Sequence, residues 1–188
     1  MMRNALLAGL TAMACALPAA ADTLSLDVSS DAARAVYTRM LPPDGLEAGA
    51  GLLHHSDDGD LAELSLHRID RPEPGRDALT LAVGGKTVLA SDDPRDANGG
   101  AVALGGQLRW TLPMYNRAAL AGGLYYAPSA TAFSDIDGYQ EYSLRGEFQL
   151  LEDASAYLGY RNIELGYDDA GPDRDFEDGV FAGLRLQF

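Results

Sequence analysis

The final strand-like segment limits most strongly what this chain can fold into. Its residues alternate between two faces, and one face is apolar up to the last position: Val180, Ala182, Leu184, Leu186 and Phe188. The opposite face holds Phe181, Gly183, Arg185 and Gln187. Side chains along a strand point to opposite sides with a period of two. A strand of this kind, ending in an aromatic residue, is typical of the last strand of a bacterial outer-membrane β-barrel, where one face meets lipid and the other meets the lumen.

The beginning of the chain has the features of an export signal. Arg3 supplies a positive charge, an apolar stretch follows, and Ala19-Ala20-Ala21 forms a cleavage site of the A-x-A type. A lipoprotein signal built on Cys15 is the alternative, but the preceding residues lack the large aliphatic side chain usual at such sites. We therefore expect a signal peptide over residues 1–21 and one domain over residues 22–188, which contains no cysteine.

Charge excludes one class of partner. The chain has 28 acidic and 14 basic residues, which gives a formal net charge of −14 at pH 7. Nucleic acid is therefore not an expected partner, because phosphate binding requires Lys and Arg. After residue 21 no apolar run approaches the length of about 20 residues that a membrane helix needs. If the protein lies in a membrane, it must do so as a closed barrel, in which every backbone polar group is paired.

The rest of the chain is predicted to be all-β. Ten segments with strand character are separated by turn residues, and none after the signal peptide has helical periodicity. We expect a closed, antiparallel, up-and-down transmembrane barrel of ten strands. A count of eight stays open, because the first two segments are short. With both chain ends in the periplasm, the longer, acid-rich connections lie on one side and the shorter ones on the other, as in bacterial barrels.

A soluble periplasmic barrel of the lipocalin type, or a β-sandwich, would show the same alternation. In a soluble protein the apolar face of each strand is the inner one, so inside and outside would exchange. The aromatic residue at Phe188 and the asymmetry of the connections favour the membrane barrel.

Several stretches of sequence resemble the YfaZ family of outer-membrane proteins. The similar stretches are Leu53-His54-His55 with Gly59-Asp60, Leu104-Gly105-Gly106 with Leu112-Pro113, Gly123 to Pro128, Tyr157 to Arg161, and Gly183 to Phe188. The resemblance implies an outer-membrane barrel and supplies no substrate or mechanism. The last strand also resembles the signal read by the barrel-assembly machinery, with Gly183, Leu186 and Phe188 at the matching positions. Phe181 departs from that signal, because a polar residue is more usual there.

The first candidate site is the lumen. In the membrane barrel, seven ionisable side chains are expected to point inward as a lumen charge network: Glu63, His67, Arg109, Glu141, Arg145, Glu147 and Arg185. A barrel of eight to ten strands is narrow enough for side chains to fill it. Opposite charges inside would pair, because an unpaired buried charge is costly. The network either plugs the barrel and holds it rigid, or lines a narrow pore that selects small solutes.

The second candidate is the set of acidic connections, which offer oxygen ligands to Ca²⁺ or Mg²⁺. These are Asp57-Asp58-Gly59-Asp60, Asp92-Asp93, and the stretch from Asp168 to Asp178. An EF-hand starting at Asp173 is rejected, because its sixth and twelfth positions hold Asp178 and Leu184. We expect a solvated, self-repelling loop face without a metal site. Bridging to lipopolysaccharide by divalent cations is the alternative.

The sequence contains only weak indications of a catalytic site. His54 and His55 near acidic residues could belong to a protease, and Ser65 with His67 could belong to a lipid hydrolase. Neighbouring histidines on a strand face opposite ways, and no Gly-x-Ser-x-Gly motif occurs. We predict no enzyme activity, no catalytic residue and no cofactor.

The sequence thus predicts a structural protein or a narrow, porin-like passive channel of the Gram-negative outer membrane, exported through the periplasm. Its expected partners are outer-membrane lipid, lipopolysaccharide and, during insertion, the barrel-assembly machinery. An outer-membrane hydrolase and a soluble periplasmic binding barrel are the alternatives.

Overall fold

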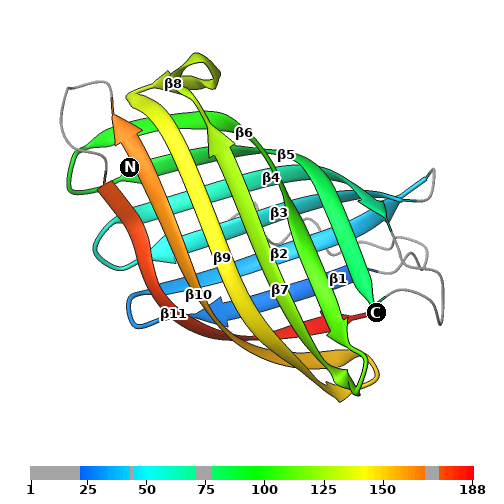
Figure 1. Ribbon diagram of the computed structural model, residues 1–188. Coiled ribbons are helices and arrows are strands. Elements are labelled where there is room, and N and C mark those ends of the chain that lie inside the picture. Colours follow the sequence, from blue (N-terminus) through cyan, green and yellow to red (C-terminus); the bar gives the residue numbers. More distant parts are fainter. Residues whose placement is uncertain (1–21, 43–44, 71–77, 168–173) are drawn as a thin grey trace.

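Ten antiparallel strands form the wall of a closed barrel in the computed structural model, which describes residues 22–42, 45–70, 78–167 and 174–188. The strands are β1 (Asp22–Val28), β2 (Ala32–Leu41), β3 (Leu46–His55), β4 (Gly59–Asp70), β5 (Leu79–Asp92), β6 (Ala97–Leu112), β7 (Tyr115–Ala127), β9 (Ile136–Leu151), β10 (Ala154–Tyr167) and β11 (Arg174–Gln187). Sequential strands lie side by side around the wall (Figure 1). No helix in the described part of the chain is long and apolar enough to cross a bilayer.

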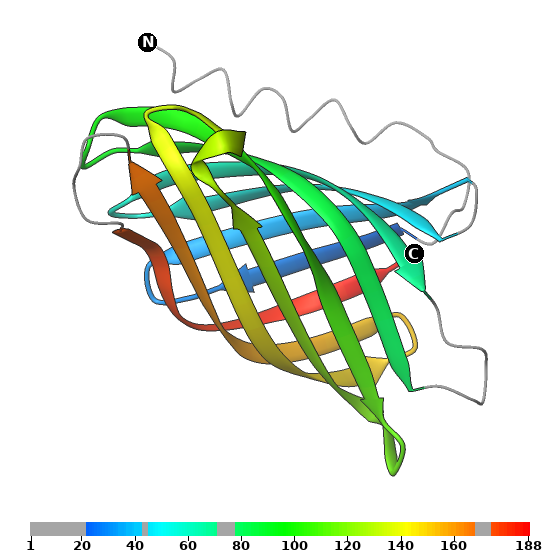
Figure 2. The same cartoon turned by 45° about the horizontal axis from the view of Figure 1, so that its top comes forward.

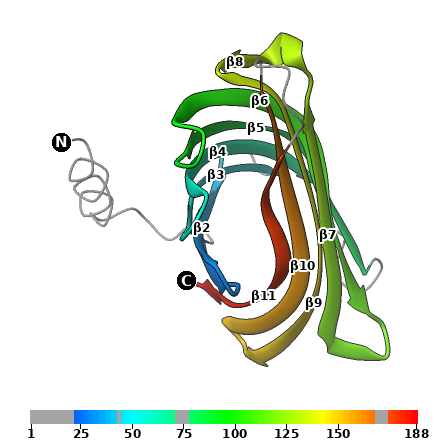
Figure 3. The same cartoon turned by 90° about the vertical axis from the view of Figure 1, so that its left-hand side faces the viewer.

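The ring is closed by the pairing of its first and last strands. β1 pairs with β11, where Ser25 lies opposite Arg185. The other neighbours in the wall follow the order of the chain, as β5 and β6 do. The backbones of Asp22 and Phe188 exchange two N–H···O bonds of 3.0 Å at this seam. Figure 3 shows the ring of strands from one end. The predicted closed antiparallel barrel is confirmed, and its ten strands include the two short first segments as β1 and β2.

The two ends of the barrel differ. We call the end where β1 begins and β11 ends the terminal rim, and the opposite end, with the β3–β4 and β5–β6 turns, the distal rim. The β7–β9 connection contains a 3₁₀ turn, η2 (Ser129–Thr131), and a short strand, β8 (Ala132–Ser134). β8 pairs with Gly99–Ala101 of β6. This connection projects at the distal rim (Figure 2).

The alternation of side chains places large apolar residues on the outside of the wall. Leu64, Leu104 and Leu144 are 65%, 72% and 63% exposed, although each lies in the middle of a long strand. Their neighbours in sequence point inward, and many of these are small or polar. The facing predicted for the last strand is also observed, since Val180 is exposed whereas Phe181 is buried.

One boundary differs from the sequence-based expectation. β11 begins at Arg174, so Asp175, Glu177 and Asp178 belong to a strand and not to an acidic loop. The physical reason is pairing with β10: Asn162 donates a 2.7 Å hydrogen bond to Asp175, and Arg161 binds Glu177. The predicted signal peptide at 1–21, the proline-rich break at 71–76 and the acidic residues at 168–173 lie outside the described residues.

Gly183 is required for packing at the seam. A Cβ atom there would lie 2.5 Å from the carbonyl oxygen of Leu26 and 2.5 Å from the ring of Tyr157. The Tyr157 hydroxyl donates to that same carbonyl at 3.2 Å, so the ring cannot easily move. By contrast, nothing lies within 4 Å of a Cβ atom built on Gly146.

We predict that Gly183→Val lowers the free energy of unfolding by about 1–3 kcal/mol, the usual cost of overpacking. Urea unfolding of the barrel refolded in detergent measures this value. Gly146→Val is the matched control and should stay close to the parent, because its side chain enters open space. Equal stability of the two variants would show that Gly183 has no packing role.

Candidate functional site

The barrel interior is divided along its axis, and its distal half is packed. Buried apolar side chains from every barrel strand except β1 meet there. They are Ala32, Leu53, Leu61, Val88, Ala90, Ala101, Ala103, Tyr125, Ala127, Ile136, Tyr139, Ile163, Leu165, Tyr167 and Phe176. We call this set the distal core. Two of its largest members, Tyr139 and Phe176, are 2% and 1% exposed. The distal half of the lumen is therefore filled by side chains.

A layer of ion pairs underlies the distal core. Lys86 Nζ donates to Glu63 at 3.1 Å and also to Glu141. Arg34 binds the same two carboxylates, at 2.6 Å and 3.3 Å. The Tyr139 hydroxyl, which belongs to the distal core, donates to Glu141. Two cations thus balance two carboxylates in a buried cluster, which we call the lysine cluster.

A second buried group joins the seam to β10. Arg161 makes a bidentate pair with Glu177, at 2.7 and 2.9 Å, and donates to Asp27 of β1 at 2.8 Å. The guanidinium also lies 4.7 Å from the centre of the Phe181 ring. Three strands are connected by one side chain, because Arg can direct several N–H donors at once.

The terminal half of the barrel contains a cavity of about 530 Å³. The cavity is lined near the terminal rim by Thr23, Thr38 and Gln187, which lie no more than three residues from the terminal-rim ends of their strands. Arg34 and Lys86 line its inner end. The cavity therefore extends from the lysine cluster to the terminal rim.

Three arginines from different strands form the side of this cavity. Arg109 of β6, Arg145 of β9 and Arg185 of β11 all bind the single carboxylate of Glu147, at 2.7, 2.8 and 3.0 Å. We call this group the arginine cluster. The Glu147 side chain is only 1% exposed, whereas that of Arg109 is 40% exposed.

His67 belongs to neither cluster. Its Nε2 lies 2.7 Å from the Tyr125 hydroxyl, which also accepts a 2.9 Å hydrogen bond from Gln107. Among the described residues no hydrogen bond links Ser65 to His67, so the pair considered for a hydrolase is not assembled. His54 lies on the surface, with its Nδ1 atom 2.7 Å from Oδ1 of Asp60. Nδ1 of His55 accepts a hydrogen bond from the backbone N–H of Asp58.

All seven residues predicted to face the lumen point inward, but they do not form one network. Glu63 and Glu141 lie in the lysine cluster. The arginine cluster contains Arg109, Arg145, Glu147 and Arg185, and His67 is separate. Sequence reasoning missed Lys86, Arg34 and Arg161. Alternation along β5 could have found Lys86, since it shares the face opposite Leu79, Leu81 and Val83.

The interpretation of the acidic connections as a solvated, self-repelling face is wrong for two of their residues. Asp58 and Asp92 are buried at the distal rim. Arg174 of β11 binds Asp58 and lies 3.6 Å from Asp92, and the Tyr167 hydroxyl donates to Asp92. One arginine that sequence alone could not place therefore contacts a buried carboxylate of each turn. Among the residues that the structure describes, no group of His, Cys, Asp or Glu could hold a metal ion.

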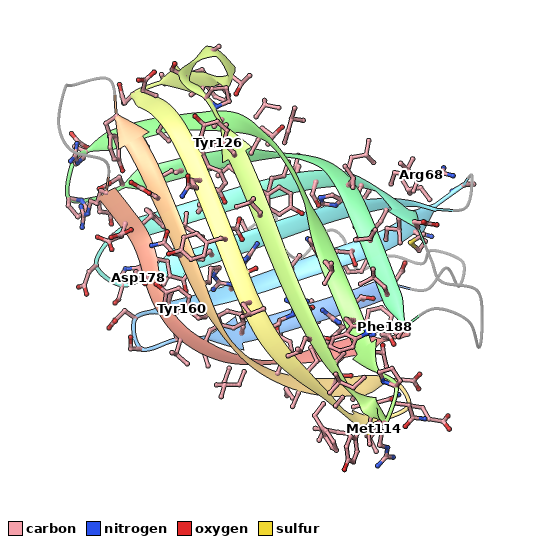
Figure 4. All side chains as sticks on the ribbon, viewed as in Figure 1. Arg68, Met114, Tyr126, Tyr160, Asp178 and Phe188 are labelled. Carbon is pink, nitrogen blue, oxygen red and sulfur yellow. The ribbon has the colours of Figure 1, made fainter. Side chains whose placement is uncertain are left out.

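The outer surface bears two sets of exposed aromatic residues. Trp110, Tyr115, Phe148 and Phe188 lie toward the terminal rim, and Tyr126, Phe133, Tyr142 and Tyr160 lie toward the distal rim. Figure 4 shows Phe188 and Met114 near one end and Tyr126 and Tyr160 nearer the other. Aliphatic side chains occupy the surface between them. Transmembrane barrels have such a band with an aromatic girdle at each interface.

A comparison with protein families agrees with the family resemblance. The family model described as YfaZ precursor matches residues 1–188. None of the curated proteins matches the chain. Among solved structures, the NanC porin is similar with a TM-score of 0.49 and 10% identity, over 90% of this chain and 99% of the porin. The outer-membrane channel DcaP of Acinetobacter baumannii gives a TM-score of 0.42 and 14% identity, over 87% of this chain, which spans 54% of that channel.

Removing the ammonium group from the lysine cluster should destabilise the barrel. Lys86→Met leaves two buried carboxylates to share Arg34, and breaking a buried ion pair in this way costs about 3–5 kcal/mol. Urea unfolding in detergent measures the change. Adding Glu141→Gln to this variant removes the excess carboxylate charge and should restore part of the lost stability.

Arg68→Met is the control, because Arg68 lies on the exposed face of β4. A Lys86→Met variant as stable as this control would show that the lysine cluster does not stabilise the fold.

Proposed function

This chain belongs to the YfaZ family, and we propose on that premise that it is an outer-membrane β-barrel closed to the free diffusion of hydrated solutes. Its cavity then opens toward the periplasm. The observation that carries this proposal is the distal core, which fills the lumen with side chains from nine of the ten wall strands.

The exterior supports a location in a membrane. Large apolar side chains such as Leu64, Leu104 and Leu144 are exposed around the wall, whereas charges are gathered inside. A soluble barrel would expose the charged face instead. Because β1 pairs with β11, the backbone of the wall has no open edge, which is the condition for crossing hydrocarbon with strands. An export signal at residues 1–21 would direct the chain through the periplasm to the outer membrane.

The packing of the barrel interior supports a mechanical role for the protein. The distal core and the lysine cluster tie opposite strands together through the lumen, so the wall cannot flatten without breaking ion pairs. The narrow passive channel is the second candidate, and it requires the distal core to move aside. The proposal assigns no catalytic step, since His67 is engaged by Tyr125 and His54 lies on the surface.

The proposal includes two kinds of contact. Lipid acyl chains cover the aliphatic band, and the headgroup regions, including lipopolysaccharide, meet the aromatic residues. Gly183, Leu186 and Phe188 act as the signal for the assembly machinery during insertion. Leu186 in β11 and Phe188, which directly follows this strand, are exposed, so a partner can reach them.

Location is tested by fractionation of cells that express the full chain. We expect recovery in the outer membrane, and an unheated form that migrates faster on a gel than the heated form, because a closed barrel stays compact in detergent. Recovery in the soluble periplasm would overturn the membrane location.

The closed state is tested by conductance in planar bilayers. The parent protein should give no steady current, because its distal core excludes water. Leu53→Ala combined with Phe176→Ala should produce measurable conductance, since both side chains are 1% exposed within the core. Leu104→Ala with Leu144→Ala, on the outer face, is the matched control and should remain silent. A steady current through the parent would favour the narrow channel instead.

A further inference from the structure

The arginine cluster presents more positive charge to the cavity than the protein neutralises. Arg109, Arg145 and Arg185 all line the cavity, whereas Glu147 lies behind them and is not part of the lining. One carboxylate therefore serves three guanidinium groups, and the cluster has a formal surplus of two positive charges. Buried or half-buried charges of one sign are costly unless an opposite charge joins them.

Most of the N–H donors in the cluster are available. A guanidinium has five N–H donors. Hydrogen bonds within the described part of the chain use two of these on Arg109, to Glu147 and Thr111, and one each on Arg145 and Arg185. The remaining donors belong to side chains that line the cavity, so they can bind an acceptor that arrives from outside the protein.

The guanidinium groups are held in place before any ligand binds. Glu147 fixes all three from behind, Thr111 accepts a 3.1 Å hydrogen bond from Arg109, and Arg145 lies 5.0 Å from the centre of the Tyr157 ring. Each arginine comes from a different strand of the closed wall. Such preorganisation reduces the side-chain ordering that binding would otherwise require.

The ionic groups of the lysine cluster and of the seam have partners of opposite sign. Lys86 and Arg34 bind Glu63 and Glu141, and Asp27 binds Arg161. Glu47 of β3 lines the cavity as well, and it is not one of the carboxylates that bind the three arginines. The formal surplus of positive charge therefore lies at the arginine cluster. The cavity, at about 530 Å³, lies within the range of about 300–1,000 Å³ typical of small-molecule sites.

We propose that the arginine cluster is a binding site for a small oxyanion that bears a phosphate or carboxylate group and enters the cavity from the terminal rim. Guanidinium groups match both kinds of anion, because they direct two parallel N–H donors at a pair of oxygens. Delivery from the periplasm rests on the proposed function, whereas binding itself depends only on the folded barrel.

Isothermal titration calorimetry of the full folded barrel, in a detergent without phosphate groups, tests the site and excludes a lipid headgroup as the source. Inorganic phosphate and citrate are the two probes, with chloride holding the ionic strength constant. We expect at least one of them to bind to the parent protein. Arg145→Gln should weaken that binding about tenfold, the factor that corresponds to loss of one hydrogen bond between charged groups.

Glu147→Gln should change the affinity for the anion in the opposite direction. It removes the competing carboxylate and raises the surplus from two to three charges, so the anion should bind more tightly than to the parent. Arg68→Gln on the outer face is the matched control and should bind as the parent does. Heat-modifiability on a gel verifies that each variant is folded.

Failure of both anions to bind to the parent, or equal binding by Arg145→Gln and Arg68→Gln, would overturn the site. A purely structural cluster predicts that Arg145→Gln and Glu147→Gln both lower stability without opposite effects on affinity. These outcomes are independent of the conductance and fractionation results, which test the proposed function separately.

Discussion

Closure of the sheet is the constraint on which the rest of the structure depends. β1 and β11 pair in register, and the backbones of Asp22 and Phe188 bond to each other at the seam. Once the ring is closed, every strand has one face outside and one inside, and the period of two assigns each residue to a side. The exposed leucines and the interior ion pairs are consequences of the same geometry, because no edge remains to be covered by other means.

The interior of a barrel of this width must be either packed with side chains or left as a cavity, and the two halves of this lumen differ in that respect. The distal half excludes water with aromatic and aliphatic side chains, and glycine and alanine in β6 and β7 leave room for the larger ones. Toward the terminal rim the lumen contains charges and a cavity. The lysine cluster lies at the boundary, where Tyr139 belongs to the core and also donates to Glu141. Buried charge is tolerated there because every member of the cluster has partners.

Sequence predicted the fold well because alternation is a local property. The facing of Leu64, Glu63 and Arg185 could be read from their neighbours alone. The charges that meet across the lumen could not be predicted in this way, because their contacts depend on the stagger between strands. Alternation along one strand contains no information on that stagger. Thus Glu147 was expected in one network with Glu63, but it lies in a separate cluster. The burial of Asp58 and Asp92 was missed for the same reason, because Arg174 reaches them from a strand distant in sequence.

Lys86 has a consequence beyond the ion pairs it makes. It is the only lysine of the chain, and it is 4% exposed inside the closed wall. The outer surface of the folded barrel therefore offers no side-chain amine to a lysine-specific protease, and the cavity that Lys86 lines is too small to admit one. Such a protease reaches Lys86 only after the wall opens. The rate of cleavage at Lys86 therefore measures opening of the barrel, with no background from surface lysines.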